Sequence, residues 1–228
     1  MRTFPSLRAL ASRTRLRRVG RTLPGLLRGS DVAITYASVV TVVAVVLALA
    51  PAHVRDDVVQ RCSTNLTNLR DRPVFVLVVS AFVIPSLQGL WQLPLLVLLY
   101  TAAQRWVGRA ATVFVAALGH VGATLLVAAL IASGITHGRL AASVARASDV
   151  GVSYGLACLA GFLVSRAPAR WRAPYVVAAA AYFVAPLLIN QTFTDVGHAT
   201  AFLLGLGLAF LAARVAAAAD VGGRIRMA

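Results

Sequence analysis

Six apolar segments, each free of Asp, Lys and Arg, lie between residues 31 and 214. They cover approximately Val32–Ala50, Leu87–Ala103, Ala110–Ser133, Val150–Ser165, Pro174–Asn190 and Val196–Ala213. A helix of about 20 apolar residues crosses a hydrocarbon core that is about 30 Å thick. Because 59% of the residues are hydrophobic and only 13% are charged, a water-soluble globule could not cover this much apolar surface. The sequence therefore predicts an all-α integral membrane protein that crosses the bilayer six times.

Arginines mark the two sides of the predicted bundle. All 22 basic residues are arginine, and the lack of lysine is typical of a GC-rich bacterial genome. Six of them follow the first or the third apolar segment: Arg55, Arg61, Arg70, Arg72, Arg139 and Arg146. The other sixteen lie on the opposite side. Because connections rich in basic residues stay inside, both termini are predicted to be cytoplasmic and the protein to lie in the plasma membrane. This topology explains the net charge of +15 without nucleic acid as a partner.

The chain divides into three parts by composition. Residues 1–30 form a basic cytoplasmic arm, which either lies on an anionic leaflet as an amphipathic segment or only fixes the topology. Residues 31–214 form the membrane domain, and residues 215–228 form a short basic cytoplasmic tail. The apolar stretch Pro73–Ile84 is too short to cross a bilayer alone. We expect it to be buried against the bundle or to be re-entrant.

Two of the predicted membrane helices carry polar residues in a matching pattern. Asp149 and Asp195 precede the fourth and sixth apolar segments, where a carboxylate can cap a helix N-terminus. Ser153 follows its aspartate by four residues, and His198 follows its own by three. At about 1.5 Å per residue, both lie roughly 5–6 Å below the helix starts. A hydroxyl and an imidazole are therefore expected at the same depth near the extracytoplasmic face.

Small residues next to this pair allow the two helices to approach closely. Gly151 and Gly155 are four residues apart on the fourth segment, and Gly197, Ala201 and Gly205 recur every four residues on the sixth. Membrane helices with such spacing pack with their backbones close together. A serine brought within hydrogen-bond distance of a histidine can act as a nucleophile, with the histidine as its general base.

The motif Gly151-Val152-Ser153, followed by a small-residue helix, resembles the nucleophile motif of the rhomboid family of intramembrane serine proteases. His198, with Ala201 at +3 and Gly205 at +7, is similar to the histidine helix of that family. The resemblance covers about residues 31–214 and implies a six-helix core, with Ser153 as the nucleophile and His198 as the general base. It also relates Pro73–Ile84 to the membrane-dipping first loop of the family, and Gln104-xxx-Gly108 to its Glu-xxx-Gly motif.

The sequence departs from the family pattern at several places, among them the Trp-Arg motif of the first loop and the glycine at +3 from His198, which are both absent. Two further departures concern the site itself. The family usually has glycine after the serine, whereas this chain has Tyr154. On the second helix the family has His-xxx-Asn, whereas the best alignment places Gln88 and Gln92 there. Their spacing of four predicts one helix face, from which a glutamine amide could donate to an oxyanion.

Three functions follow from these features. The first is an intramembrane serine protease that cleaves transmembrane segments. The second is a catalytically inactive rhomboid-fold protein that binds client transmembrane helices, which Tyr154 and the lost His-xxx-Asn motif favour. The third is a small transporter that uses His120 and His198 for protons, although we expect His120 to form a hydrogen bond to a neighbouring helix. Transmembrane proteins and the lipid bilayer are the expected partners, and no metal or cofactor is implied.

Overall fold

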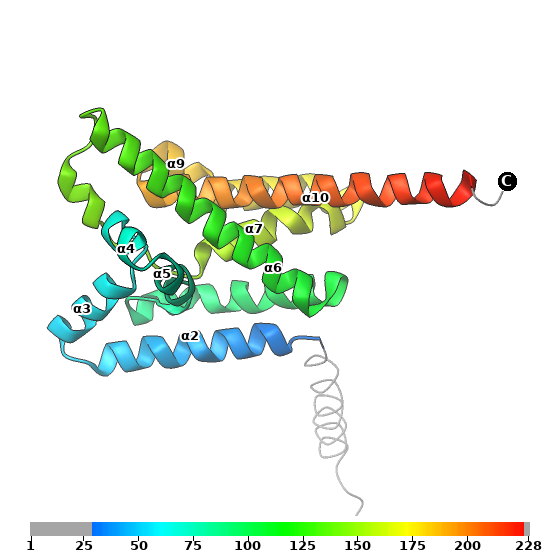
Figure 1. The fold of residues 1–228 in the computed structure, drawn as a ribbon. Coiled ribbons are helices and arrows are strands. Elements are labelled where there is room, and N and C mark those ends of the chain that lie inside the picture. The colour runs from blue at the N-terminus through cyan, green and yellow to red at the C-terminus, as the bar shows by residue number, and fades with distance from the viewer. Residues whose placement is uncertain (1–28, 226–228) are drawn as a thin grey trace, which may run out of the picture.

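The computed structural model describes residues 29–225, and every regular element in that range is helical (Figure 1). The α-helices are α2 (Asp31–Leu49), α3 (Ala52–Cys62), α4 (Leu66–Asp71), α5 (Pro73–Val79), α6 (Leu93–Thr136), α7 (Ser153–Leu163), α8 (Ala169–Phe183), α9 (Ala185–Ile189) and α10 (Phe193–Ile225). The short 3-10 helices are η1 (Ser80–Phe82), η2 (Leu87–Gln92), η3 (Ala142–Arg146) and η4 (Val164–Arg166). The predicted all-α fold is confirmed. Most of the predicted arm, residues 1–28, lies outside the described residues.

Three stretches of the described chain are long and apolar enough to cross a membrane. They are Asp31–Leu49, Leu87–Thr136 and Phe193–Val215. The helices of the fourth and fifth predicted spans are shorter, with 11 residues in α7 and 15 in α8. Six crossings therefore remain a prediction. The last helix runs on to Ile225, so the predicted tail from residue 215 begins inside α10 rather than after it.

Helix α6 consists of two helices that fold back on each other at Gly108 (Figure 1). Gly108 has φ +83°, and a Cβ there would meet nothing within 4 Å, so the backbone conformation and not the space requires glycine. Next to this turn, Gln104 donates to the Asp31 carboxylate and accepts from the Val32 N–H at 3.1 Å. Arg109 forms an ion pair with Asp31 at 2.7 Å. The Gln104-xxx-Gly108 motif thus joins the start of α2 to the reversal inside α6.

Helix α7 lies in the middle of the bundle. All of its residues from Tyr154 to Leu163 are buried, because α6 and α10 pack against it (Figure 1). A Cβ on Gly205 of α10 would lie 2.0 Å from the Cys158 carbonyl oxygen, and a Cβ on Gly161 of α7 would lie 2.2 Å from the Phe202 carbonyl oxygen. The backbones of α7 and α10 therefore touch. A helix surrounded by protein in this way does not need the length of a lipid-exposed span.

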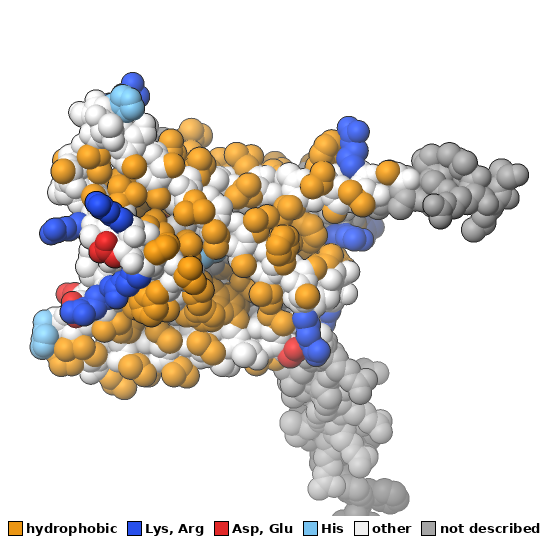
Figure 2. Space-filling model, viewed as in Figure 1, with side chains coloured by type: hydrophobic (Ala, Val, Ile, Leu, Met, Phe, Trp, Pro, Cys, Tyr) orange, Lys and Arg blue, Asp and Glu red, His pale blue; other side chains and the backbone are white. Residues whose placement is uncertain are grey.

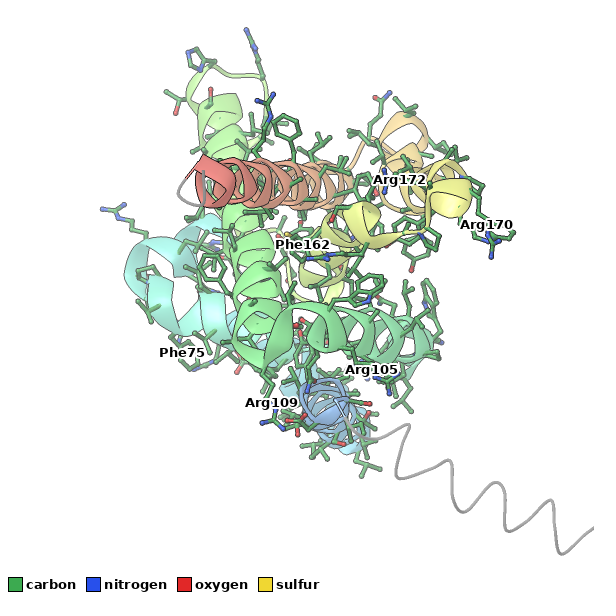
Figure 3. The ribbon with its side chains drawn as sticks, turned by 90° about the vertical axis from the view of Figure 1, so that its right-hand side faces the viewer. Phe75, Arg105, Arg109, Phe162, Arg170 and Arg172 are labelled. Atoms are coloured by element: carbon green, nitrogen blue, oxygen red, sulfur yellow. The ribbon has the colours of Figure 1, made fainter. Side chains whose placement is uncertain are left out.

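The segment Pro73–Ile84 packs one face against the bundle. Val76 and Ser80 are buried, whereas Val74 is 75% and Phe75 is 47% exposed, and Phe75 points outward in Figure 3. The stretch forms α5 and η1 instead of a crossing helix. The segment therefore packs against the bundle along one face only, so the expected burial holds in part, and a re-entrant position in the bilayer stays a prediction.

Charged side chains gather at the two ends of the molecule, with an apolar band between them (Figure 2). Arg105, Arg109, Arg170 and Arg172 lie at the end that faces the viewer in Figure 3. The described chain also begins and ends at this end (Figure 1). An uncharged band between two charged ends fits a protein embedded in a bilayer. That the end with both termini is cytoplasmic stays a prediction.

Candidate functional site

Asp149 and Asp195 do not occupy the N-cap positions that the sequence predicts for them at the starts of α7 and α10. Helix α10 begins after Thr192, whose hydroxyl accepts from the Asp195 N–H at 3.2 Å, while the Asp195 carboxylate accepts from the Thr192 N–H at 3.1 Å. This reciprocal pair is a capping box with the aspartate at its third helical position. Helix α7 begins only at Ser153, because Gly151 with φ +139° turns the chain before it. Asp149 therefore lies too far upstream to cap α7.

Asp149 instead joins three parts of the fold. Its backbone N–H donates to the Ser63 hydroxyl at 2.7 Å, and its carbonyl oxygen accepts from the Thr64 N–H at 3.0 Å. Its carboxylate accepts from the Tyr154 hydroxyl at 3.1 and 3.2 Å. Burial raises the pKa of Asp149 to about 6, although hydrogen bonds from Tyr154 and Thr64 act in the opposite direction. Asp149 thus fixes both the connection between α3 and α4 and the side chain of Tyr154.

Tyr154 fills the space between α7 and α10 at the site. It is 3% exposed, and its ring meets the His198 ring edge to face with centroids 5.3 Å apart. A Cβ on Gly197 would lie 2.2 Å from the Tyr154 ring, so the glycine leaves room for the phenol. On its other side, the Tyr154 ring lies 6.2 Å from the His120 ring. The tyrosine is therefore the residue of α7 that faces His198.

Ser153 and His198 are not joined by a hydrogen bond within residues 29–225. The Nε2 atom of His198 is buried and has no hydrogen-bond partner among the described residues. Ser153 is half-buried and lines a small void together with Thr64, His120 and Tyr154. Consecutive residues of an α-helix point about 100° apart. Since Tyr154 faces α10, Ser153 is directed to another side of α7.

The proposed oxyanion donors do not share a helix face. Gln88 and Gln92 belong to η2, a 3-10 helix with about three residues per turn, so a spacing of four places them on different sides. Gln88 is exposed, and the Gln92 amide donates to the Gly89 carbonyl oxygen at 3.3 Å. The expectation of one shared face is wrong, because it assumed that α-helix begins before Leu93.

The small residues of α7 also take separate roles. Gly155 packs against α6 and not α10, since a Cβ there would lie 3.3 Å from the Tyr100 hydroxyl and 3.4 Å from the Ala116 carbonyl oxygen. Gly151 serves the turn before α7 rather than a helix contact. On α10, Ala201 is fully buried. Within the described range no group of three His, Cys or Asp side chains is arranged to hold a metal ion.

A family model described as a rhomboid-like protein matches residues 26–218. The chain belongs to the rhomboid-like family. It matches no curated protein and no solved structure.

This rhomboid-like protein has a buried hydroxyl–imidazole pair that the sequence did not indicate. The Ser80 hydroxyl lies 3.0 Å from Nε2 of His120, and the two residues are 0% and 6% exposed. The Ser80 carbonyl oxygen also accepts from the Gly151 N–H at 3.0 Å. Ser80 therefore ties η1 to α6 and to the turn before α7. The expected hydrogen bond from His120 to a neighbouring helix is confirmed, but its partner was missed because Ser80 lies in an otherwise apolar run.

We expect Ser80→Ala to lower the free energy of unfolding by about 1–3 kcal/mol, because it leaves a buried imidazole nitrogen without its partner. The matched control is Ser133→Ala, which removes the hydroxyl near His137 from an exposed pair at the end of α6, the helix that carries His120. That control should change stability by less than about 0.5 kcal/mol. Unfolding in mixed detergent micelles measures both. Equal midpoints for the two variants would contradict a structural role for the buried pair.

Proposed function

We propose that this rhomboid-like protein binds transmembrane segments of other membrane proteins and does not cleave them. The observation that carries the proposal is the position of Tyr154, whose ring lies against His198 where a nucleophile would be needed. A serine activated by histidine needs a hydrogen bond of about 2.6–3.2 Å between them. In this chain Tyr154, the residue after Ser153, lies beside the imidazole of His198.

Several contacts oppose a rearrangement that would bring Ser153 to His198. Turning the first turn of α7 would break both hydrogen bonds from the Tyr154 hydroxyl to the Asp149 carboxylate. It would leave that buried carboxylate without this donor, at a cost of about 1–3 kcal/mol or more. It would also move the phenol away from the space that Gly197 leaves for it. These costs support binding without catalysis.

The proposed binding place is the seam between η2 and α8. Of the residues of α8, only Ala179 and Phe183 are buried, and α8 lies at the edge of the bundle (Figure 3). Its first half is held by a hydrogen bond from the Tyr175 hydroxyl to the Ala160 carbonyl oxygen at 2.8 Å. Its second half meets η2 through an edge contact between Tyr182 and Trp91, with centroids 5.9 Å apart. An element with so little buried surface opens at low cost, which would admit a client helix.

The second candidate is an intramembrane serine protease, which one observation favours. In the part of the chain that the structure describes, the buried Nε2 of His198 has no hydrogen-bond partner, and a serine hydroxyl would satisfy it. In that mechanism His198 takes the proton of Ser153, and the serine oxygen attacks a peptide carbonyl of an unwound substrate helix. The Ser153 backbone N–H would hold the oxyanion. Tyr154 would first have to leave its place beside the imidazole.

Site-specific photo-crosslinking in native membranes tests the proposed function. A photoreactive phenylalanine analogue at Tyr182 is expected to capture transmembrane segments of other proteins at their full length. The control position is Phe210 of α10, which is 61% exposed but lies away from the seam. The same pattern is expected in a Ser153→Ala background. Captured partners that are truncated in wild type and full-length only in Ser153→Ala would contradict the absence of cleavage. Equal capture at Tyr182 and Phe210 would contradict binding at this seam.

A further inference from the structure

The imidazole of His198 packs against aromatic rings from neighbouring helices. The Tyr154 ring of α7 meets it edge to face, and the Phe183 ring of α8 lies 6.3 Å from it between centroids. Phe183 is 3% exposed and stacks on Phe202 of α10, with centroids 6.4 Å apart. These rings hold the imidazole in place, but phenylalanine has no polar atom and the Tyr154 hydroxyl is donated to Asp149. Within the described chain, Nε2 of His198 is therefore left without a hydrogen bond.

Three other buried side-chain atoms lack a hydrogen bond among the described residues, and each differs from Nε2 of His198. The hydroxyls of Thr101 and Thr124 lie within α6, where a threonine hydroxyl can bond the carbonyl oxygen of the preceding turn. His120 already bonds Ser80 through its other ring nitrogen. His198 forms no hydrogen bond from either ring nitrogen to any described residue, so its hydrogen-bonding capacity is unused by the fold.

An unpaired nitrogen at this depth is unfavourable for the protein on its own. No water in a hydrocarbon core replaces a missing partner, and a buried donor or acceptor without a hydrogen bond costs free energy. A phenylalanine at position 198 would pack against the same rings without this cost. Unpaired buried polar groups in a native fold therefore call for a functional explanation, and a partner from another molecule supplies one.

The last turn of α8 separates His198 from the seam between η2 and α8. At the seam, the Tyr182 ring meets Trp91, with centroids 5.9 Å apart. The next residue is Phe183, whose ring lies 4.6 Å from that of Tyr182 and 6.3 Å from that of His198. Opening of this half of α8 would carry Phe183 away from the imidazole. A client helix in the opened seam would then replace Phe183 as the neighbour of His198.

We propose that His198 recognises clients by a hydrogen bond between Nε2 and a neutral hydroxyl or carboxamide side chain in the client's transmembrane segment. The inference rests on the proposed function, because it needs a client helix in the seam. A neutral imidazole presents a donor or an acceptor at Nε2, depending on its tautomer. Hydroxyl and carboxamide side chains both donate and accept, so they match either tautomer, whereas an aliphatic side chain matches neither.

The position of His198 also predicts where the client carries this side chain. His198 lies in the second turn of α10, which begins at Phe193. The start of α10 is at the predicted extracytoplasmic end. The polar residue of the client is therefore expected within about two turns of the extracytoplasmic end of its transmembrane segment.

Photo-crosslinking with two designed clients tests the proposal. Both clients are epitope-tagged single-span helices of the same topology, co-expressed with the full chain, and they differ only by threonine or valine at one position two turns from the extracytoplasmic end. The two side chains have nearly the same shape, so the comparison isolates the hydroxyl. With a photoreactive phenylalanine analogue at Tyr182, capture of the threonine client should exceed capture of the valine client by about three- to thirtyfold.

Substitutions of histidine separate recognition by Nε2 from packing of the ring. His198→Phe keeps an aromatic ring and should bring the capture ratio of the two clients close to one. His198→Gln places an amide near the position of Nε2 and should retain a preference for threonine. His137→Phe changes an exposed histidine at the end of α6 and should keep the wild-type ratio. Because the readout is a ratio between two clients, a lower amount of folded variant does not alter it.

The outcomes distinguish this proposal from the proposed function. Equal capture of the two clients by wild type, or an unchanged preference in His198→Phe, would overturn recognition by His198 and leave binding at the seam intact. Absence of capture of both clients at Tyr182 would contradict the proposed function, and the inference that rests on it would fail with it.

Discussion

Gly205→Ala is expected to be the most damaging small substitution in the membrane domain. Its Cβ would lie 2.0 Å from the Cys158 carbonyl oxygen and 2.8 Å from the Phe162 backbone nitrogen. Both are backbone atoms of a buried helix, so α7 and α10 must separate to make room. Overpacking usually costs about 1–3 kcal/mol, and a clash between backbones belongs at or above the upper end of that range.

The same helix offers a matched control for this substitution. Gly207 is two residues further along α10, and a Cβ there would meet nothing within 4 Å. Gly207→Ala should leave stability unchanged or raise it by up to about 1 kcal/mol, because alanine favours helix over glycine. Reversible unfolding in mixed micelles measures both variants. Similar midpoints for Gly205→Ala and Gly207→Ala would contradict the contact between the backbones of α7 and α10.

Asp149 is expected to make the protein less stable as the pH rises from about 4 to 6. Burial raises the pKa of this carboxyl to about 6, from 3.8. Between these values the folded state binds a proton that the unfolded state has lost, so stability is fully present below the lower value and is lost as the pH rises through the upper one. The loss is about 3 kcal/mol.

Asp149→Asn removes this titration while keeping an acceptor for the Tyr154 hydroxyl. The variant should therefore show a flatter dependence of unfolding free energy on pH, and should be more stable than wild type at pH 7. Asp71→Asn changes the total charge equally at an exposed position of α4 and should retain the wild-type slope. Parallel pH profiles of wild type and Asp149→Asn would show that the buried carboxyl does not titrate in this range.

The sequence predicted the parts of the fold that depend on composition and on spacing along one helix. These parts are the apolar segments, the packing of one face of Pro73–Ile84 against the bundle, and the close helix contact at the small residue Gly205. The apolar segments follow from the exclusion of charged residues from the bilayer, and the close helix contact follows from the lack of a side chain at a glycine. No knowledge of the neighbouring helices is required for such a prediction.

The direction of side chains at the site could not be predicted in the same way. It depends on where α7 begins, and a start at Ser153 rather than near Asp149 changes which residue faces α10. The sequence shows that Tyr154 departs from the family pattern, but the contacts of Tyr154 with Asp149 and Gly197 depend on the tertiary structure. The 3-10 conformation around Gln88 and the partner of His120 likewise depend on elements distant in sequence.

Under the proposed binding function, His198 does not activate Ser153, because Tyr154 lies beside the imidazole. Labelling of the membrane-embedded protein with a serine-reactive fluorophosphonate measures this activation, with Ser153→Ala and His198→Ala as references. Wild type should be labelled no more than either variant. Labelling of wild type that both substitutions abolish would contradict it and would assign the protein to the proteases of its family.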